Sequence, residues 1–148
     1  MTKLTLPWPP SVNRYWRHPS TGRLAGRHLI STDGRKYREQ VAAMTMLQTD
    51  AHYTGSLTVD ITANRPDNRR RDLDNLLKAI LDSLTHAGIW SDDSQISDLR
   101  IKWGEKVVPD GSVEIYISGD ICHRHAQETQ DRVGECHSGD SRGIKPQK

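Results

Sequence analysis

The densest group of charged side chains lies between residues 69 and 82, in the string RRRDLDNLLKAILD. Three arginines, Arg69 to Arg71, run directly into Asp72 and Asp74. Two carboxylates spaced two residues apart point the same way in an extended segment, but lie about 200° apart around a helix. Asp72 and Asp74 can therefore meet one ion only if they straddle the junction between a loop and a helix.

A second pair of acids, Asp92 and Asp93, follows directly after the helix expected for residues 73–87. A helix of that length spans only about 22 Å, so Asp93 can approach Asp72 and Asp74 if the chain doubles back. Hard divalent cations such as Mg²⁺ prefer oxygen ligands and keep several waters. Two or three of these carboxylates would suit such an ion.

Carboxylates beside arginines are suited to cleaving a phosphodiester bond. A bound metal activates water and polarises the phosphoryl oxygen, while a lysine such as Lys78 balances the charge that develops. Arg69, Arg70 and Arg71 would hold neighbouring phosphates, because their planar guanidinium groups fit oxyanions. A plainer interpretation also stands, in which one aspartate caps the helix, Asp74 and Lys78 form a surface pair, and the later acids lie in a solvated turn.

The elements that must position these residues follow from periodicity. Alternating apolar residues predict strands near residues 3–8, 57–63, 96–103 and 113–117, the last two joined as a hairpin across the turn at Pro109 to Gly111. Capping residues at positions 31–33 predict a helix to about Thr49 with Tyr37, Val41, Met44 and Gln48 along one side. The apolar spacing after Leu73 predicts a second helix ending at Gly88.

Residues 11–30 form a basic segment without sustained periodicity, which predicts a loop. It contains Arg14 and Arg17, and between them Tyr15 and Trp16, which are candidates for DNA contact because aromatic rings stack on unpaired bases. Trp8 and Trp90 are more typical of core packing.

The order of elements predicts a single α+β domain over residues 1–118, a mixed sheet covered by two main helices. Hydrophobic residues make up 34% of the 148 residues, and residues 119–148 show almost no apolar periodicity. A disordered C-terminal extension is therefore expected over that range.

Bulk composition excludes several classes of protein. The sequence has no apolar run of the roughly 20 residues that a membrane helix needs, and no signal-peptide pattern. Its two cysteines lie outside the periodic segments, so a disulfide framework is not expected. A cytoplasmic protein without a small-molecule cofactor is the expectation. The net charge of +2 is too small to identify a nucleic-acid partner by itself.

The string from Arg69 to Ile101 and the opening LPWPPSVNRYWR closely resemble the RusA family of Holliday junction resolvases, over roughly residues 3–118. The resemblance implies a homodimer of mixed α/β fold that binds four-way DNA junctions in recombination and repair. It also implies paired symmetric nicks with Mg²⁺ or Mn²⁺ and a bacterial or phage origin. The family's catalytic acids, which bind the metal, fall on Asp72, Asp74 and Asp93, and its essential lysine falls on Lys78.

Two alternatives remain open at this point. One is an architectural protein that binds junctions without cutting them. The other is a Mg²⁺-dependent nuclease that acts on flaps or simple duplex DNA. Both share the basic segments, and they differ from a resolvase in the role of the acids or in the shape of the substrate.

Overall fold

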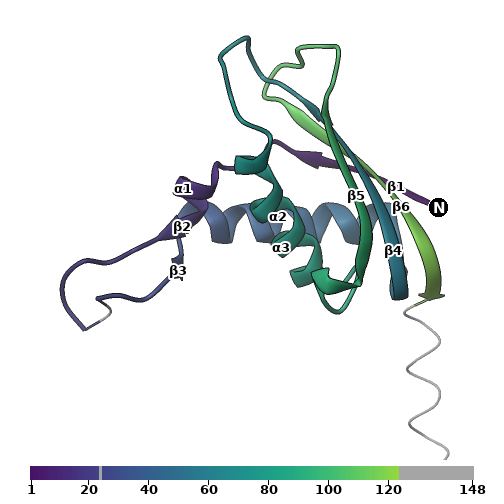
Figure 1. Ribbon diagram of the computed structural model, residues 1–148, viewed down its shortest axis with the longest axis horizontal. Helices are drawn as coiled ribbons and strands as arrows, with labels where there is room; N and C mark the ends of the chain where they lie inside the picture. Colours follow the sequence, from purple (N-terminus) through teal and green to yellow (C-terminus); the bar gives the residue numbers. More distant parts are fainter. Residues whose placement is uncertain (24, 124–148) are drawn as a thin grey trace, which may run out of the picture.

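The computed structural model describes residues 1–23 and 25–123. A four-stranded sheet lies at its centre, with strand order β1-β6-β4-β5 (Figure 1). The strands are β1 (Thr2–Pro7), β4 (Ala51–Asn64), β5 (Ile96–Trp103) and β6 (Ser112–His123). β6 pairs antiparallel with β1 and β4, whereas β5 runs parallel to β4. The expected mixed sheet of an α+β domain is confirmed.

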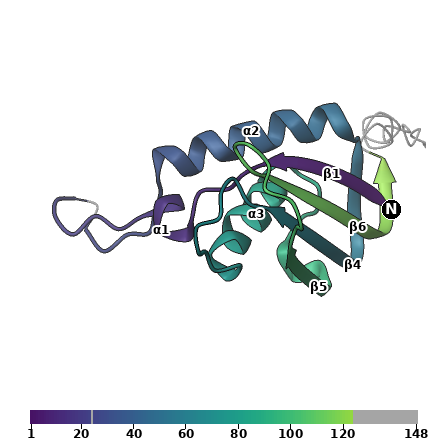
Figure 2. The same cartoon turned by 90° about the horizontal axis from the view of Figure 1, so that it is seen from above.

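One face of the sheet carries the hydrophobic core. Residues of β4 alternate between buried and half-buried, with Leu57, Val59, Ile61 and Ala63 all turned inward. Such alternation is typical of a sheet with one face in the core and the other toward solvent. Helices α2 (Thr32–Gln48) and α3 (Asp74–His86) both lie on the buried side (Figure 2). No helix in the described part of the chain is long and apolar enough to cross a membrane.

The two helices begin and end where the sequence predicts. The Ser31 side chain caps α2 by accepting a hydrogen bond from the Gly34 backbone N–H, 2.9 Å away. α3 ends before Gly88, whose φ of +73° is a conformation that favours glycine. The residues of α2 that face the core differ in part from those expected. Tyr37 and Val41 are buried as expected, but Thr45 is buried in place of Met44, and the Gln48 side chain is exposed.

The hairpin predicted for the last two strands is wrong. β5 and β6 lie on opposite sides of β4, so that Ala63 pairs with Trp103 on one side and with Val113 on the other. α3 provides the crossover that a parallel neighbour of β4 requires. The loop of residues 104–111 then carries the chain past β4 to its other side.

The basic segment is more ordered than a loop. It contains the short helix α1 (Val12–Tyr15) and the paired strands β2 (Trp16–Arg17) and β3 (Leu29–Ile30). Residues 16–23 and 25–30 project from the body of the molecule, and we call them the arm (Figures 1 and 2).

β6 continues past the expected domain end at Ser118 as far as His123. Its last residues pair with the start of β4, where Ile121 lies opposite Tyr53. Residues 119–123 therefore belong to the sheet. The remainder of the expected extension, residues 124–148, lies outside the described residues.

Candidate active site

Asp72 and Asp74 straddle the start of α3, as the spacing of the two carboxylates requires. Asp74 is the first helical residue, Leu73 is the N-cap, and Asp72 lies in the preceding loop. Leu73 provides no side-chain cap, and within residues 1–23 and 25–123 neither aspartate has an ion pair or a side-chain hydrogen bond. The two exposed carboxylates are therefore not used to cap the helix and remain available to a ligand.

Asp74, Lys78 and Asp82 recur every four residues and so share one face of α3. The Lys78 Nζ lies 2.8 Å from an oxygen of Asp82. The pKa of Lys78 is raised, first by this hydrogen bond and the charge of Asp82, and then by the charge of Asp93. Lys78 is therefore held as a cation between the acids of the helix and the turn that follows it.

Asp93 begins the 3-10 turn η1 (Asp93–Gln95), which is fixed by a capping box. The Asp92 side chain accepts a hydrogen bond from the Ser94 N–H at 2.8 Å. The pKa of Asp92 is lowered, first by the Ser94 side chain and then by this backbone hydrogen bond. The Gln95 side chain donates to the carbonyl oxygens of Tyr53 and Gly55 on β4. These bonds hold Asp93 against the body of the fold, where it lines a pocket of about 340 Å³ together with Lys78 and Asp82.

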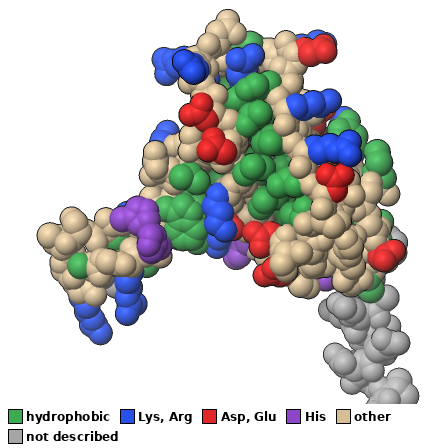
Figure 3. All heavy atoms as spheres, viewed as in Figure 1, with side chains coloured by type: hydrophobic (Ala, Val, Ile, Leu, Met, Phe, Trp, Pro, Cys, Tyr) green, Lys and Arg blue, Asp and Glu red, His purple; other side chains and the backbone are tan. Residues whose placement is uncertain are grey.

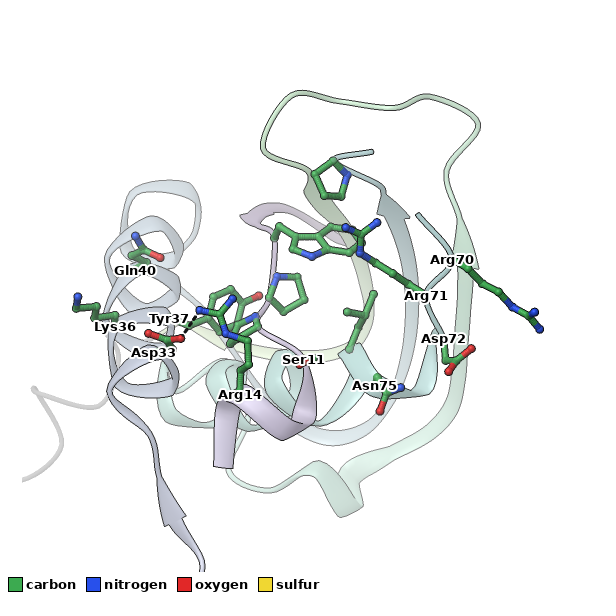
Figure 4. Close-up of a pocket in the computed structure, with 15 residues that line it drawn as sticks. Ser11, Arg14, Asp33, Lys36, Tyr37, Gln40, Arg70, Arg71, Asp72 and Asn75 are labelled. Carbon is green, nitrogen blue, oxygen red and sulfur yellow. Dashed lines mark hydrogen bonds and ion pairs between the residues drawn. The ribbon is translucent and has the colours of Figure 1, made fainter. Parts of the chain in front are cut away.

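Asp72 borders a different cavity, of about 680 Å³, between α2 and the start of α3 (Figure 4). The structure thus brings Asp93 toward Lys78, and Asp72 beside Asp74, as two neighbouring sets. In the described part of the chain, no three His, Cys, Asp or Glu side chains lie close enough together to hold a metal ion. The free carboxylates of Asp72 and Asp74 nevertheless fit Mg²⁺, which proteins usually hold by one or two carboxylates together with waters.

The loop that carries Asp72 is fixed by a four-layer stack of side chains. Arg71 donates two hydrogen bonds to Asp67, at 2.5 and 2.9 Å, and lies over the Trp8 ring. Trp8 stacks on Trp103 with ring centroids 6.4 Å apart, and Arg65 covers the Trp103 ring. Cation–π and aromatic contacts of this kind each contribute about 0.5–1.5 kcal/mol. They hold the loop between the ends of β1 and β5.

Five arginines are candidates for phosphate contact, and they differ in their present partners. Arg14 pairs with Asp33 at 2.6 Å, and Arg71 is held by Asp67. Arg69 is largely exposed and touches Asp67 only at 3.9 Å. Arg70 and Arg17 form no ion pair with any described residue. Among the described residues, Arg70 and Arg17 are therefore the cations of this set without an ion pair, and Arg69 has only a long one. Figure 4 shows Arg70 extending outward near Asp72.

Of the aromatic candidates, Tyr15 is fully buried, so its ring is not available to DNA. Its hydroxyl accepts a 2.6 Å hydrogen bond from Arg38, which shows a structural role. Trp16 is half-buried and remains partly accessible. Trp90 lies in the core as expected, and Trp8 packs against the core within the stack.

Three residues that shape the site were given no role from the sequence, although Asp82 ends the charged string described there. Asp82 has a signal there, because it follows Lys78 by the four residues that favour a helical ion pair. Gln95 also has one, because it follows Asp92 with capping-box spacing. Asp67 has none, because its pairing with Arg71 depends on the fold of an irregular loop.

Residues 7–118 match the family model for the endodeoxyribonuclease RusA. A crossover junction endodeoxyribonuclease of Enterobacteria phage HK97 is 44% identical over 117 residues, covering 78% of this chain and 92% of the phage protein. Proteins of the same name from Enterobacteria phage 82 and Escherichia coli K12 are 48% and 46% identical, each covering 66% of this chain and 78% of the relative.

Proposed function

The chain belongs to the RusA family of endodeoxyribonucleases, and from this we propose that it resolves Holliday junctions by a metal-dependent nick in each of two strands. The observation that carries the proposal is the pair of carboxylates without an ion pair among the described residues, Asp72 and Asp74, of which Asp74 lies one helical turn from the protonated Lys78. Relatives in bacteria and their phages support a role in recombination and repair in the bacterial cytoplasm.

In this proposal Asp72 and Asp74 hold Mg²⁺ or Mn²⁺, and Asp93 joins them as a third ligand only when the two neighbouring sets of acids draw together around the ion. The ion when bound would lower the pKa of water and offset charge on the phosphoryl oxygens. The Lys78 ammonium group stands beside Asp93 and neutralises charge that builds up as the P–O bond breaks. Asp82 orients that ammonium group through its 2.8 Å contact. Arg69 and Arg70 hold the phosphates next to the one that is cut.

We further propose that two copies of the chain act as a dimer through an apolar strip on the face formed by α3 and β5 (Figure 3). The strip comprises partly exposed residues of both elements: Leu73, Leu77, Leu81, Leu99, Ile101 and Trp103. Leu99 is 39% exposed although it lies beside the buried Val59, because no helix in the described part of the chain covers this end of the sheet. Two cuts related by a twofold axis call for a C2 dimer, and a self-complementary apolar surface fits one.

The two alternatives from the sequence are less well supported. An architectural protein would gain nothing from two unpaired carboxylates beside DNA phosphates, because their charge opposes binding. A nuclease for flaps or duplex DNA keeps the same chemistry and changes only the substrate.

The test is cleavage of end-labelled four-way junction, flap and matched duplex DNA, each with Mg²⁺ or with EDTA. We expect nicks at symmetric positions in opposite strands of the junction, only with Mg²⁺. Cleavage of flap or duplex DNA at the same rate as the junction would identify a nuclease that does not select for junctions. No cleavage of any of these substrates with any divalent metal would exclude nuclease activity.

A further inference from the structure

The arm presents positive charge that no described residue neutralises. Arg17, Arg23 and Arg27 are exposed, and the sequence contains no acidic residue before Asp33. Among the described residues, none of the three arginines takes part in an ion pair. The arm is thus suited to an anionic partner.

The base of the arm is held firmly against α2. Trp16 pairs with Ile30 across the ribbon, and the Ser31 N–H donates to the Tyr15 carbonyl oxygen at 2.9 Å. The arm packs so closely here that a Cβ at Gly34 would lie 2.7 Å from both the Ile30 side chain and the Tyr15 carbonyl oxygen. A surface at this base is therefore pre-formed, which lowers the cost of binding.

A cavity of about 730 Å³ lies at the base of the arm. Its apolar wall is formed by the half-buried side chains of Trp16, Leu29 and Ile30. The charged residues of its lining are three arginines, Arg17, Arg35 and Arg38, and one acid, Glu39, so positive charge predominates. The volume falls within the range of about 300–1,000 Å³ that is usual for small-ligand sites. An aromatic side chain can stack on the base of a nucleotide, and the neighbouring guanidinium groups can bind its phosphate.

The cavity adjoins the candidate active site. Arg38 and His86 line both the cavity and the pocket that contains Lys78 and Asp93. The Arg38 guanidinium is fixed by its bond to the Tyr15 hydroxyl, so the boundary between the two hollows is ordered. A strand whose phosphate lies near Lys78 therefore passes close to the cavity.

We propose that this cavity binds an unstacked nucleotide of the DNA strand beside the cut, with its base against Trp16 and its phosphate against Arg17 and Arg35. This inference rests on the proposed function, because it takes the strand near Lys78 to be DNA. At the crossover of a junction, where strands leave one duplex for another, stacking is interrupted, so a base there is displaced at less cost than within a duplex. Stacking on a tryptophan tolerates any base, so the cavity selects for an open strand more than for a sequence.

The test combines changes in the protein with changes in the DNA. Binding is measured in EDTA with four-way junctions that each carry one abasic position near the crossover. For the wild type, we expect one such position to weaken binding by about 10-fold, the size typical of one base–aromatic stack. Trp16→Leu should bind the intact junction about 10-fold more weakly and lose its sensitivity to that position. Trp16→Phe, which keeps an aromatic face, should retain the sensitivity.

Equal sensitivity of wild type and Trp16→Leu at every abasic position would overturn the inference. So would unchanged binding of the intact junction by Trp16→Leu. Failure of the proposed function would show differently, as no preference of the wild type for a junction over a duplex.

Arg35→Gln provides a second measurement that leaves the arm's apolar contacts intact. For Arg35→Gln binding to the junction, we plot the logarithm of the association constant against the logarithm of the salt concentration. We expect the slope to be smaller in magnitude than that of the wild type by about 0.7–0.9, which is the change expected when the protein neutralises one phosphate fewer. Arg100→Gln on β5 is the matched control, because Arg100 is exposed and lies outside the cavity. Equal slopes for the two variants would show that Arg35 does not contact a DNA phosphate.

Discussion

The acids of the site divide into those with partners and those without. Asp67 and Asp82 are engaged by Arg71 and Lys78, whereas Asp72 and Asp74 have no ion pair among the described residues. The sequence shows where acidic and basic residues are concentrated, but not which acids are paired with a cation. Side-chain pairing in an irregular loop depends on backbone positions that no periodicity encodes.

Asp82→Asn tests the positioning of Lys78. The variant keeps the size of the side chain but removes the charge that holds the Lys78 ammonium group at 2.8 Å. A small misplacement of a catalytic group can cost up to about 100-fold in rate, so we expect single-turnover cleavage to slow by about 10- to 100-fold while junction affinity changes little. Asp98→Asn on β5, which removes the partner of Arg100, is the control. An unchanged cleavage rate in Asp82→Asn would show that Lys78 does not need this partner.

The bond between Asp67 and Arg71 predicts a pH dependence of stability. Hydrogen bonds from Arg71, and then from the Arg69 backbone, hold the pKa of Asp67 far below its ordinary 3.8. A carboxyl with a depressed pKa in the folded state stabilises the fold at pH values above its unfolded pKa, and loses that effect as pH falls. Thermal unfolding followed by circular dichroism should therefore show a steeper loss of stability for wild type than for Asp67→Asn below about pH 4. Parallel curves would contradict this.

At the scale of elements, local signals predicted helices better than strand partners. The Ser31 cap, the apolar spacing of α3 and Gly88 lie within the elements that they define, so the sequence contains them directly. The pairing of β5 and β6 with opposite sides of β4 depends on contacts between distant residues. The ribbon of the arm was missed for a related reason, since its two strands have only two residues each.

The Gln48 side chain satisfies backbone hydrogen-bonding groups of β1, which is one of the two edge strands of the sheet. Its side-chain amide donates to the Thr5 carbonyl oxygen and accepts from the Thr5 N–H, at 2.9 and 2.7 Å, as a neighbouring strand would. We expect Gln48→Ala to lower the free energy of unfolding by about 1 kcal/mol, the net value typical of such bonds. Urea unfolding measures the change, with Gln40→Ala, at another exposed position of α2, as the control. Equal stability of the two variants would show that the contact contributes nothing.

At the scale of the whole molecule, the sheet has one end, at β5, that none of the helices formed by residues 1–23 and 25–123 covers. The apolar strip along α3 and β5 lies there, and β5 is an edge strand, with no further strand beside it among the described residues. Exposed edges of this kind invite pairing with another chain. The sequence predicted the apolar residues of both elements, but not that their packing leaves this face open.

Leu99→Lys tests whether the strip joins two copies of the chain. A charge in the middle of an apolar interface opposes its burial, so we expect the variant to shift from dimer to monomer in sedimentation equilibrium. Leu47→Lys is the matched control, because Leu47 is 88% exposed at the end of α2 and lies outside the strip. A wild-type protein that is monomeric, or a Leu99→Lys dimer as stable as the control, would exclude this interface.

Asp74→Asn tests most directly whether the carboxylates at the start of α3, which have no ion pair among the described residues, are required for DNA cleavage. Binding and nicking of one labelled four-way junction are measured side by side for wild type and variant, with Mg²⁺. We predict that Asp74→Asn binds the junction as tightly as wild type or more tightly, because it loses negative charge near phosphate, and that nicking is abolished. Nicking at the wild-type rate by Asp74→Asn would contradict the account.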